Sequence, residues 1–329
     1  MRSNGVCGVL LLVSLHRGKP SASSVRAIRA AKETALLLGT GYRVVALGDD
    51  LRCAAETLSQ FGADIVYLVD GPGLDHGLAE QWAPALEDVL SRCKATVLMA
   101  ASESIAVDVL PRVAGRLGAG MASDVTSVAL DDHGLTYCRF MYAGTILSTV
   151  RIESKLQVVT IRAAAFAPAE LQKETSPVEM HLAASPEKAF NQIQFLAMTP
   201  APTSGLALTD ASIVCAGGRG MGTAQKFALV EALADALHGA VAGTRAAVDF
   251  GLIGAERQVG QSGQNIAPDL YVAVGVSGAL QHMAGVRLAK TIVAINKDAD
   301  APIFKVSDFG IVGDATALVP ALIEALKDA

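Results

Sequence analysis

The chain is 329 residues long, which gives room for two domains with separate cores. Hydrophobic residues make up 51% of it and aromatic residues 5%, so small aliphatic side chains must fill those cores, as is typical of α/β layers. The formal net charge of -5 argues against nucleic-acid binding, which needs a clustered basic face. The five cysteines lie far apart and form no CxxC pair, which argues against a disulfide framework or a zinc site and favours a reducing compartment.

The first notable segment is the apolar run from Val6 to Leu15. It is too short to cross a membrane, because a spanning helix needs roughly 20 residues. Arg2 and the SAS at 21–23 are only weak versions of the basic start and the small-residue cleavage site of a signal peptide. We predict a buried first strand, followed by an amphipathic helix at 23–38. We expect a cytoplasmic protein or, as second choice, the mature form of a mitochondrial matrix protein.

The first part of the chain alternates apolar runs with helical patterns, which predicts a parallel sheet covered by helices. The pattern then changes to four apolar runs without intervening helices, at 124–130, 135–142, 145–152 and 156–163. We interpret these runs as an antiparallel addition to the parallel sheet. The expected helices of this half lie at 23–38, 53–61, 78–91 and 105–117.

A proline-rich stretch between Ala167 and Asp210 holds five of the twelve prolines, which is typical of a connection between domains. We therefore predict an N-terminal α/β domain at 1–190, a linker at 191–209 and a second domain at 210–329. The second domain is expected to be a Rossmann-like, doubly wound α/β unit. Its expected strands lie near 212–216, 270–274 and 291–295, and its expected helices at 223–237, 278–288 and 315–327.

A glycine-rich turn follows the first strand of that second domain, in the sequence AGGRGMG at 216–222. Glycines let backbone N–H groups approach a phosphate, and a following helix adds partial positive charge. The dinucleotide fingerprint G-x-G-x-x-G is not met, since Thr223 stands at its sixth position when counted from Gly218. No Lys-Ser or Lys-Thr pair completes a P-loop either. The motif alone is also compatible with a tight turn that carries a surface arginine, Arg219.

Further polar positions follow later strands. Arg245 ends a short apolar stretch, where a fixed guanidinium can stack on a flat heteroaromatic ring or simply form a surface salt bridge. The segment 258–268 is too polar for a core and reads either as a ligand-wrapping loop or as a flexible surface loop. Ser277 is the expected N-cap of the helix at 278–288, which would place His282 one turn into that helix. Taken alone, a histidine there is more typical of a packed or capping residue than of a ligand-binding one.

Taken together, these positions offer glycine turns suited to phosphates, a fixed cation, a histidine and several hydrogen-bonding groups suited to a sugar. They include no convincing nucleophile with a base, no HExxH motif and no carboxylate pair. The pattern favours a site that holds a large nucleotide without acid or base chemistry of its own.

The second half resembles the FAD domain of the electron-transferring flavoprotein (ETF) alpha subunit. The resemblance covers roughly Ile213 to Asp314, in order, and it is weaker in the first half. The segments that carry it are AGGRGMG, TRAAVDFG, QVGQSG, YVAVGVSGALQH, TIVAINKDADAPIF and SDFGIVGD. Thr244 and Ser262 stand where the family may carry Ser and Thr, so the hydroxyl is kept at both positions.

The resemblance implies a role for each matched position. Arg219, Thr244 and Ser277 would hold the FAD pyrophosphate. Arg245 would lie against the isoalloxazine ring and favour its half-reduced, negatively charged form. Ser262 would donate a hydrogen bond toward N5, beside Gln261, while Gln281 and His282 would meet the ring and ribityl region, the histidine near O2. Asn296, Asp314 and Ala315 would bind the adenosine part. The remaining implied FAD-binding positions are Val259, Gly260, Gly278, Ala279 and Leu280.

The resemblance also implies a function. The chain would carry electrons on bound FAD without turning over a substrate of its own. It would form a heterodimer with a beta subunit that holds AMP, accept electrons from flavin dehydrogenases such as the acyl-CoA dehydrogenases of fatty acid β-oxidation, and pass them to a quinone oxidoreductase. A bifurcating relative that oxidises NADH, with a second FAD in its beta subunit, is the closest alternative. A nicotinamide-dependent dehydrogenase and a non-catalytic nucleotide-binding regulator are the more distant ones.

Overall fold

The chain divides into two compact units, one formed by Met1–Phe140 and Leu147–Met198 and the other by Met141–Ile146 and Thr199–Ala329. The computed structural model describes residues 8–16, 18–48, 51–71, 73–142, 144–172, 177–184, 192–199, 206–209 and 211–327. Val6, Cys7, Pro186, Pro200 and Pro202, which entered the sequence-based expectations, lie outside these ranges. The predicted boundaries at 190 and 209 stay a prediction.

The first unit contains a nine-stranded sheet in the order β11-β5-β4-β1-β6-β10-β7-β8-β9. Its pairs from β11 to β7 are parallel, and β7 pairs with β8 in the antiparallel sense. A separate small ribbon is formed by β2 (Leu15–His16) and β3 (Lys19–Pro20). The sheet strands are β1 (Val9–Val13), β4 (Tyr42–Gly48), β5 (Ile65–Asp70), β6 (Val97–Ala101), β7 (Gly120–Asp131), β8 (Gly134–Met141), β9 (Ile146–Arg151), β10 (Gln157–Ile161) and β11 (Val178–Ala183).

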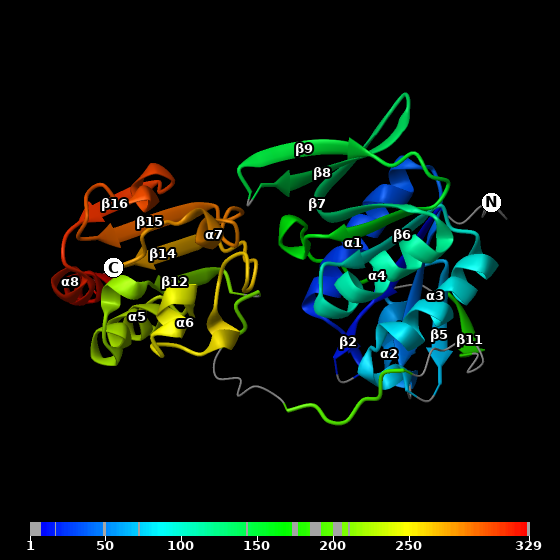
Figure 1. Cartoon of the computed structure of the whole chain (residues 1–329), viewed down its shortest axis with the longest axis horizontal. Coiled ribbons are helices and arrows are strands. Elements are labelled where there is room, and N and C mark those ends of the chain that lie inside the picture. Colours follow the sequence, from blue (N-terminus) through cyan, green and yellow to red (C-terminus); the bar gives the residue numbers. More distant parts are fainter. Residues whose placement is uncertain are drawn as a thin grey trace. The chain divides into compact units, whose positions relative to one another are not determined.

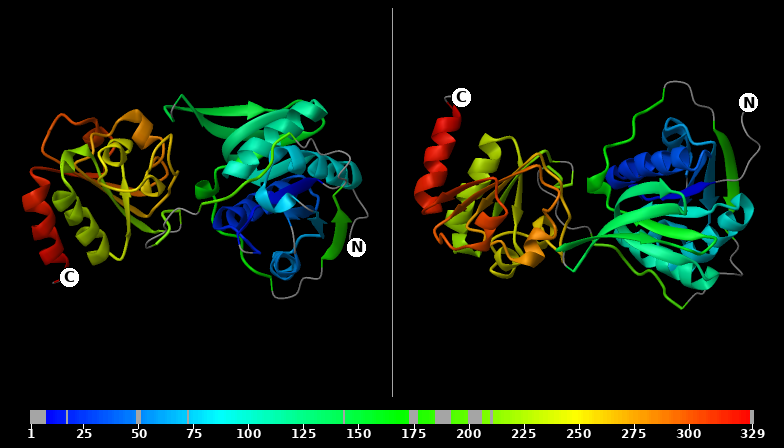
Figure 2. Two further views of the ribbon diagram at one scale, coloured as in Figure 1. Left: turned by 60° about the horizontal axis from the view of Figure 1, so that its bottom comes forward. Right: turned by 90° about the horizontal axis from the view of Figure 1, so that it is seen from above.

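Helices cover both faces of this sheet, because alternate residues of each buried strand point to opposite sides. Leu11 packs with residues of α1 (Ala22–Leu37) and α2 (Arg52–Ser59), whereas Leu10 packs with residues of α3 (Ala79–Cys93) and α4 (Ser104–Leu117). Figure 1 labels these elements, and the right-hand view of Figure 2 shows the blue α1 on one side of the strands and the cyan to green α3 and α4 on the other. The predicted helix-covered parallel sheet is confirmed.

Two details of the sheet correct the sequence-based expectations. The last of the four successive runs forms β10, which lies parallel between β6 and β7 and is not part of the antiparallel addition. The proline-rich connection contains an additional strand, β11, which pairs in parallel with β5. Further along the same connection, the backbone N–H groups of Gln192 and Ile193 each lie 3.2 Å from Oε2 of Glu80.

The second unit contains a five-stranded, all-parallel sheet in the order β13-β12-β14-β15-β16. Helices α5 and α8 pack on one face, and the opposite face is covered by α7 together with the segments around Val259 and Ile303. The strands are β12 (Ile213–Gly217), β13 (Ala240–Gly243), β14 (Leu270–Val274), β15 (Thr291–Asn296) and β16 (Phe309–Val312). The helices are α5 (Ala224–Ala236), α6 (Arg245–Asp249), α7 (Leu280–Met283) and α8 (Ala315–Lys327).

The helix predicted at 278–288 is much shorter than expected, and Ser277 is not its N-cap. The N-cap is Ala279, without a side-chain hydrogen bond. Gly278 has φ +81, a left-handed conformation that cannot belong to the helix, and a Cβ there would lie 2.4 Å from the backbone nitrogen of Ile303. At the other end, Gly285 approaches the backbone of Gly260 closely. The tertiary contacts of Gly278 and Gly285 therefore determine where this helix begins and ends.

No helix among the described residues is both long and apolar enough to cross a membrane.

Candidate nucleotide site

The candidate site lies at the switch point of the second sheet. The chain places β13 on one side of β12 and β14 on the other, so the connections after β12 and β14 lead away in opposite directions. All five strands are parallel, which brings their carboxyl ends to one edge. Crevices at such points bind ligands in open α/β sheets.

A cavity of about 1170 Å³ opens at this edge. It exceeds the roughly 300–1,000 Å³ of sites for drug-sized ligands, so it has room for a dinucleotide. The lining comes from the ends of β12, β13, β14 and β15 and from the loop around Val259. Its residues are Gly218, Arg219, Gly220, Thr244, Arg245, Ala246, Asp249, Gln258, Val259, Gly260, Gln261, Ser262, Gly275, Val276, Ser277, Ala279, Gln281, His282, Asn296, Lys297, Asp298, Ala301 and Pro302.

Two glycine turns meet at the base of the cavity. The N–H of Gly220 donates to the carbonyl of Gly275 at 3.1 Å. A Cβ on Gly218 would lie only 2.1 Å from that carbonyl oxygen, and Gly275 itself has φ +63. Glycine is thus required for the close approach of the turns after β12 and β14. Backbone, rather than side chains, forms this part of the wall, which suits a phosphate group.

Thr244 and Arg245 begin α6 at the end of β13. The Thr244 side chain is the N-cap, accepting a hydrogen bond from the Ala247 N–H at 3.2 Å. The Arg245 side chain is 73% exposed, and its Nε lies 3.8 Å from Oδ2 of Asp249. An exposed pair of this kind contributes little stability, so it holds the guanidinium only weakly. Arg245 is free to turn toward a ligand in the cavity.

The polar segment predicted as a ligand-wrapping loop lines the cavity at 258–262. The N–H of Gln261 donates to the carbonyl of Gln281 at 2.7 Å, which ties the loop to α7. Nε2 of Gln258, a buried side chain, donates to Oγ of Ser262 at 3.0 Å. With that oxygen accepting from Gln258, the Ser262 proton remains available to another acceptor. Gln258 was not among the predicted site residues.

His282 lines the cavity but is itself buried. Its Nδ1 lies 3.0 Å from the carbonyl of Val259, and its Nε2 lies 2.6 Å from the hydroxyl of Tyr271. Burial lowers the pKa of His282 to about 4, despite the opposing hydrogen bond to Val259. The imidazole is therefore neutral at pH 7. Its two ring nitrogens are both hydrogen-bonded within the protein.

Asn296 and Asp314 follow β15 and β16. Nδ2 of Asn296 donates to the Val276 carbonyl at 2.8 Å, which ties the two strand ends together. Asp314 precedes α8 and accepts hydrogen bonds from the backbone and side chain of Thr316, both at 2.8 Å, and these bonds lower its pKa. Asp314 and Ala315 line a small adjacent cavity of about 50 Å³, whose lining shares Gly220, Gly275, Asn296 and Lys297 with the large one.

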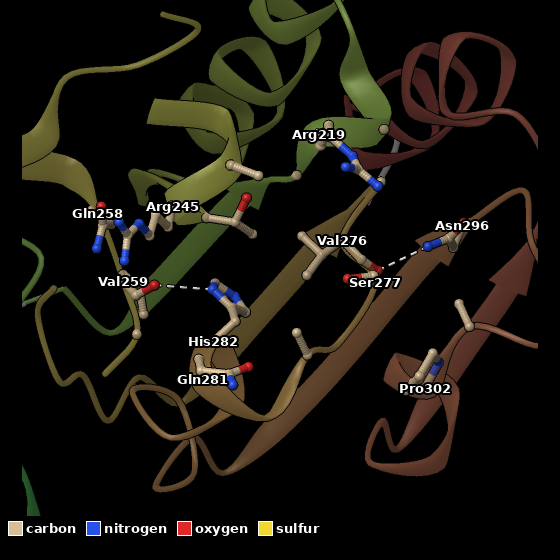
Figure 3. Close-up of a pocket in the computed structure, with 18 of the residues that line it drawn as sticks. Arg219, Arg245, Gln258, Val259, Val276, Ser277, Gln281, His282, Asn296 and Pro302 are labelled. Atoms are coloured by element: carbon tan, nitrogen blue, oxygen red, sulfur yellow. Dashed lines mark hydrogen bonds between the residues drawn. The ribbon is translucent and has the colours of Figure 1, made fainter. Parts of the chain in front are cut away.

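In Figure 3, Arg245, Gln258, Val259, Gln281 and His282 lie toward one end of the cavity and Arg219, Ser277, Asn296 and Pro302 toward the other, with Val276 between them. An elongated ligand with two chemically different ends fits this arrangement. Of the sixteen predicted positions, Asp314 and Ala315 lie at the small cavity, and Gly278 and Leu280 do not line either cavity. The cavity brings together the other predicted residues, which are Arg219, Thr244, Arg245, Val259, Gly260, Gln261, Ser262, Ser277, Ala279, Gln281, His282 and Asn296.

The charges of the lining are mixed, with three cations (Arg219, Arg245, Lys297) and two carboxylates (Asp249, Asp298). The excess of one positive charge favours an anionic ligand. Within the described part of the chain, no group of three or more His, Cys, Asp or Glu side chains is placed to hold a metal ion.

When the chain is compared with known protein families, two family models match consecutive parts of it. Residues 9–186 match the electron transfer flavoprotein domain, and residues 207–287 match the electron transfer flavoprotein FAD-binding domain. The chain belongs to the electron transfer flavoprotein alpha subunit family. This confirms the resemblance stated from the sequence, and it extends the match to the first unit, where the sequence motifs alone were weak.

Individual ETF alpha subunits match the chain over nearly its full length. The electron transfer flavoprotein subunit alpha of Thermoanaerobacterium thermosaccharolyticum is 34% identical over 97% of both chains. The protein of the same name from Mycobacterium leprae is 37% identical, over 97% of this chain and 98% of its own. The mitochondrial electron transfer flavoprotein subunit alpha of Oryza sativa subsp. indica is 37% identical, over 97% of this chain and 90% of its own.

Proposed function

We propose that the chain binds FAD in the cavity of its second unit and serves as the alpha subunit of a two-subunit electron carrier. The observation that carries this proposal is the cavity itself, which lies at the switch point of a sheet whose domain matches an FAD-binding family model. Its backbone wall, its excess positive charge and its two groups of side chains all fit a dinucleotide with a flat ring at one end.

The phosphate-binding part would be the glycine turns with the cations beside them. Arg219 lies between Gly218 and Gly220 in the chain, and Lys297 lines both cavities together with Gly220 and Gly275. Their positive charges would neutralise the pyrophosphate, while the hydroxyls of Thr244 and Ser277 would donate to its oxygens. Lys297 is an addition to the positions implied by the family resemblance.

The ring-binding part would lie at the other end, among Arg245, Gln261, Ser262, Gln281 and His282. FAD supplies the ability to take up and release electrons one at a time. The Arg245 guanidinium would lie against the ring and stabilise negative charge that develops there. Ser262 would donate to N5, because its Oγ already accepts from Gln258. His282 would approach the ring as a neutral group.

The adenosine part would lie near Asn296, Asp314 and Ala315. Asn296 already donates to Val276, so it would act on the ligand chiefly by fixing the strand ends. The small cavity beside the large one supports this placement, since the two share four lining residues, Gly220, Gly275, Asn296 and Lys297.

The proposal includes a partner and a role. A beta subunit would hold AMP and complete the carrier, flavin dehydrogenases such as the acyl-CoA dehydrogenases would donate electrons, and a quinone oxidoreductase would accept them. The chain would have no substrate turnover of its own, and we propose a cytoplasmic location. The segment 191–209 would link the domains at 1–190 and 210–329 and allow the second to move.

The decisive experiment is coexpression with the candidate beta subunit, followed by a visible spectrum and identification of the extracted nucleotides. One FAD with AMP supports the simple carrier, and two FADs identify the bifurcating type that oxidises NADH. A colourless complex that does not take up added FAD contradicts the proposal. Reversible binding of a nicotinamide cofactor in place of flavin would identify a dehydrogenase.

A further inference from the structure

Gln258 is a buried amide side chain in the cavity wall. The residue is 9% exposed, and its Nε2 donates to Oγ of Ser262 at 3.0 Å. Ser262 is exposed and lines the same cavity. Among the described residues, no other hydrogen bond reaches the Ser262 hydroxyl. A buried donor therefore acts on a hydroxyl group that is open to a ligand.

The backbone around Gln258 is fixed on both sides. The N–H of Gln258 donates to the Ala255 carbonyl at 3.1 Å, and the Gln258 carbonyl accepts from the Gln264 N–H at 2.8 Å. The N–H of the next residue, Val259, donates at 3.0 Å to the carbonyl of Gly243, the last residue of β13. The amide side chain of Gln258 thus extends from a point that is tied to the sheet.

The turn that carries Ser262 is closed by backbone contacts as well. The Gly260 N–H donates to the Gln264 carbonyl at 3.2 Å, and the Gly263 N–H donates to the Gly260 carbonyl at 3.0 Å. A Cβ on Gly263 would lie 2.4 Å from the Gln258 carbonyl oxygen, so the turn passes very close to Gln258. The contact between the Gln258 and Ser262 side chains is therefore built into the loop.

This contact determines where the Ser262 proton can go. A hydroxyl group has one proton and two lone pairs, whereas an amide NH₂ can only donate. Gln258 therefore occupies a lone pair of the Ser262 oxygen and cannot accept the Ser262 proton. The proton is left for an acceptor in the cavity. N5 of oxidised FAD is such an acceptor, whereas a ring with a C–H group in its place offers none.

We propose that Gln258 is a positioning residue that turns the Ser262 proton into the cavity, so that the site selects a ring with a hydrogen-bond acceptor at N5. This inference rests on the proposed function for its ligand, FAD. The effect of Gln258 on N5 passes through Ser262. Without the Gln258 N–H, the Ser262 hydroxyl can turn either way, and the selection for an acceptor weakens.

The test compares the binding of FAD with that of 5-deaza-FAD, in which a C–H group replaces N5, to the heterodimer after its flavin has been removed. The two ligands share phosphates, sugar and ring shape, so the ratio of their dissociation constants isolates the contact at N5. Gln258→Met removes the amide and keeps a chain of similar length. Gln264→Met is the control, because Nε2 of Gln264 donates to the Glu256 carbonyl at 2.6 Å in the same loop, and Gln264 does not line the cavity.

We expect the parent to bind FAD roughly tenfold more tightly than 5-deaza-FAD, and Gln258→Met to prefer FAD only about twofold. Gln264→Met should keep the preference of the parent. Ser262→Ala should abolish it, and adding Gln258→Met to Ser262→Ala should not change the ratio further. Gln258→Glu provides a second variant of the same shape, should Gln258→Met fail to fold. Its carboxylate accepts the Ser262 proton and turns it away from the ring, so the preference should again be lost.

Equal binding of the two flavins by the parent overturns the inference and leaves the proposed function intact, whether or not any variant folds. A Gln258 variant that binds both flavins more weakly by the same factor overturns it too, because a purely structural role would act on both ligands. The same holds if Gln264→Met loses as much of the preference as Gln258→Met. A parent that binds neither flavin contradicts the proposed function and, with it, this inference.

Discussion

The large sheets of the two units each contain a switch point between parallel strands, and the chain fills one with side chains and leaves the other open. In the first sheet the switch point lies between β1 and β6. There Ser21 Oγ donates to Glu103 at 2.7 Å, and the Ser14 N–H donates to Ser24 Oγ at 3.0 Å. In the second sheet, between β12 and β14, Gly218 and Gly275 directly follow the strand ends and line the cavity.

The comparison shows that the topology offers a site and that the residues at the strand ends decide whether it is used. Serine and glutamate side chains bond to one another over the first switch point, and the Glu103 carboxylate would repel a phosphate there. Glycine at the second switch point removes the side chains, while Arg219 and Lys297 bring positive charge. Substitutions at these positions test this difference between the two sheets.

The largest effect is expected from Gly218→Ala. The added Cβ would lie 2.1 Å from the Gly275 carbonyl, so the two turns must separate. We expect a loss of about 3 kcal/mol in the free energy of unfolding, measured with urea, together with loss of FAD binding. Gly115→Ala in α4 is the control, since a Cβ there meets nothing within 4 Å, and it should be neutral or stabilising. Unchanged FAD binding in Gly218→Ala would contradict the role of the glycine turns.

The next effect concerns pH and His282. Its pKa is lowered by burial to about 4 in the folded chain, against 6.5 as the ordinary value. Between these values the unfolded chain binds a proton that the folded chain does not, so stability falls as the pH drops below 6.5 and is independent of this group above it. By pH 5 the loss amounts to about 2 kcal/mol.

His282→Gln removes this titration and keeps a side chain that can donate to Val259. Urea unfolding of parent and variant at a series of pH values measures the effect. The free energy of unfolding of the parent minus that of the variant should be constant from pH 7 to 8. It should be about 2 kcal/mol lower at pH 5 than at pH 7. Parallel curves over the whole range would mean that the folded histidine titrates normally.

A smaller effect is expected from Arg245→Ala in the flavin-loaded heterodimer. The guanidinium is expected to stabilise negative charge on the ring by about 1.5 kcal/mol, so less of the half-reduced, anionic flavin should accumulate on stepwise reduction. Absorbance during the reductive titration measures that fraction. Arg257→Ala is the control, because Arg257 carries the same charge in the same unit, does not line the cavity and donates to the Leu206 carbonyl at 2.6 Å. Equal accumulation in parent and Arg245→Ala would remove the assigned role.

Much of the fold followed from the sequence because buried parallel strands read as apolar runs. The run LYVAV at 270–274 is β14 to the residue, and 315–327 is α8. The order of strands was harder, since β10 enters between β6 and β7 through pairings that adjacency in the sequence does not show. The strand β11 was missed because prolines flank it, although Val178, Met180 and Leu182 show the alternation of a strand.

The candidate site was predictable where its residues belong to glycine turns or polar loops. Gln258 was not predicted as a site residue, because a glutamine at the start of a polar loop does not by itself indicate ligand binding. Its role depends on the 3.0 Å contact with Ser262, which only the structure shows. The helix after Ser277 was overestimated because the close approach of Gly278 to Ile303 is a tertiary contact.

The smallest expected effect compares the helix that follows the first strand of each sheet. Ser21 caps α1 by accepting from the Ser24 N–H at 3.0 Å and also donates to Glu103, whereas Thr223 caps α5 through a longer contact of 3.4 Å to the Lys226 N–H. Ser21→Ala should therefore cost about 1 kcal/mol and Thr223→Ala about 0.5 kcal/mol in the free energy of unfolding. Equal losses would mean that the bond to Glu103 adds nothing to the cap. The two switch points would then differ in being filled or open, and the helix caps beside them would contribute equally to stability.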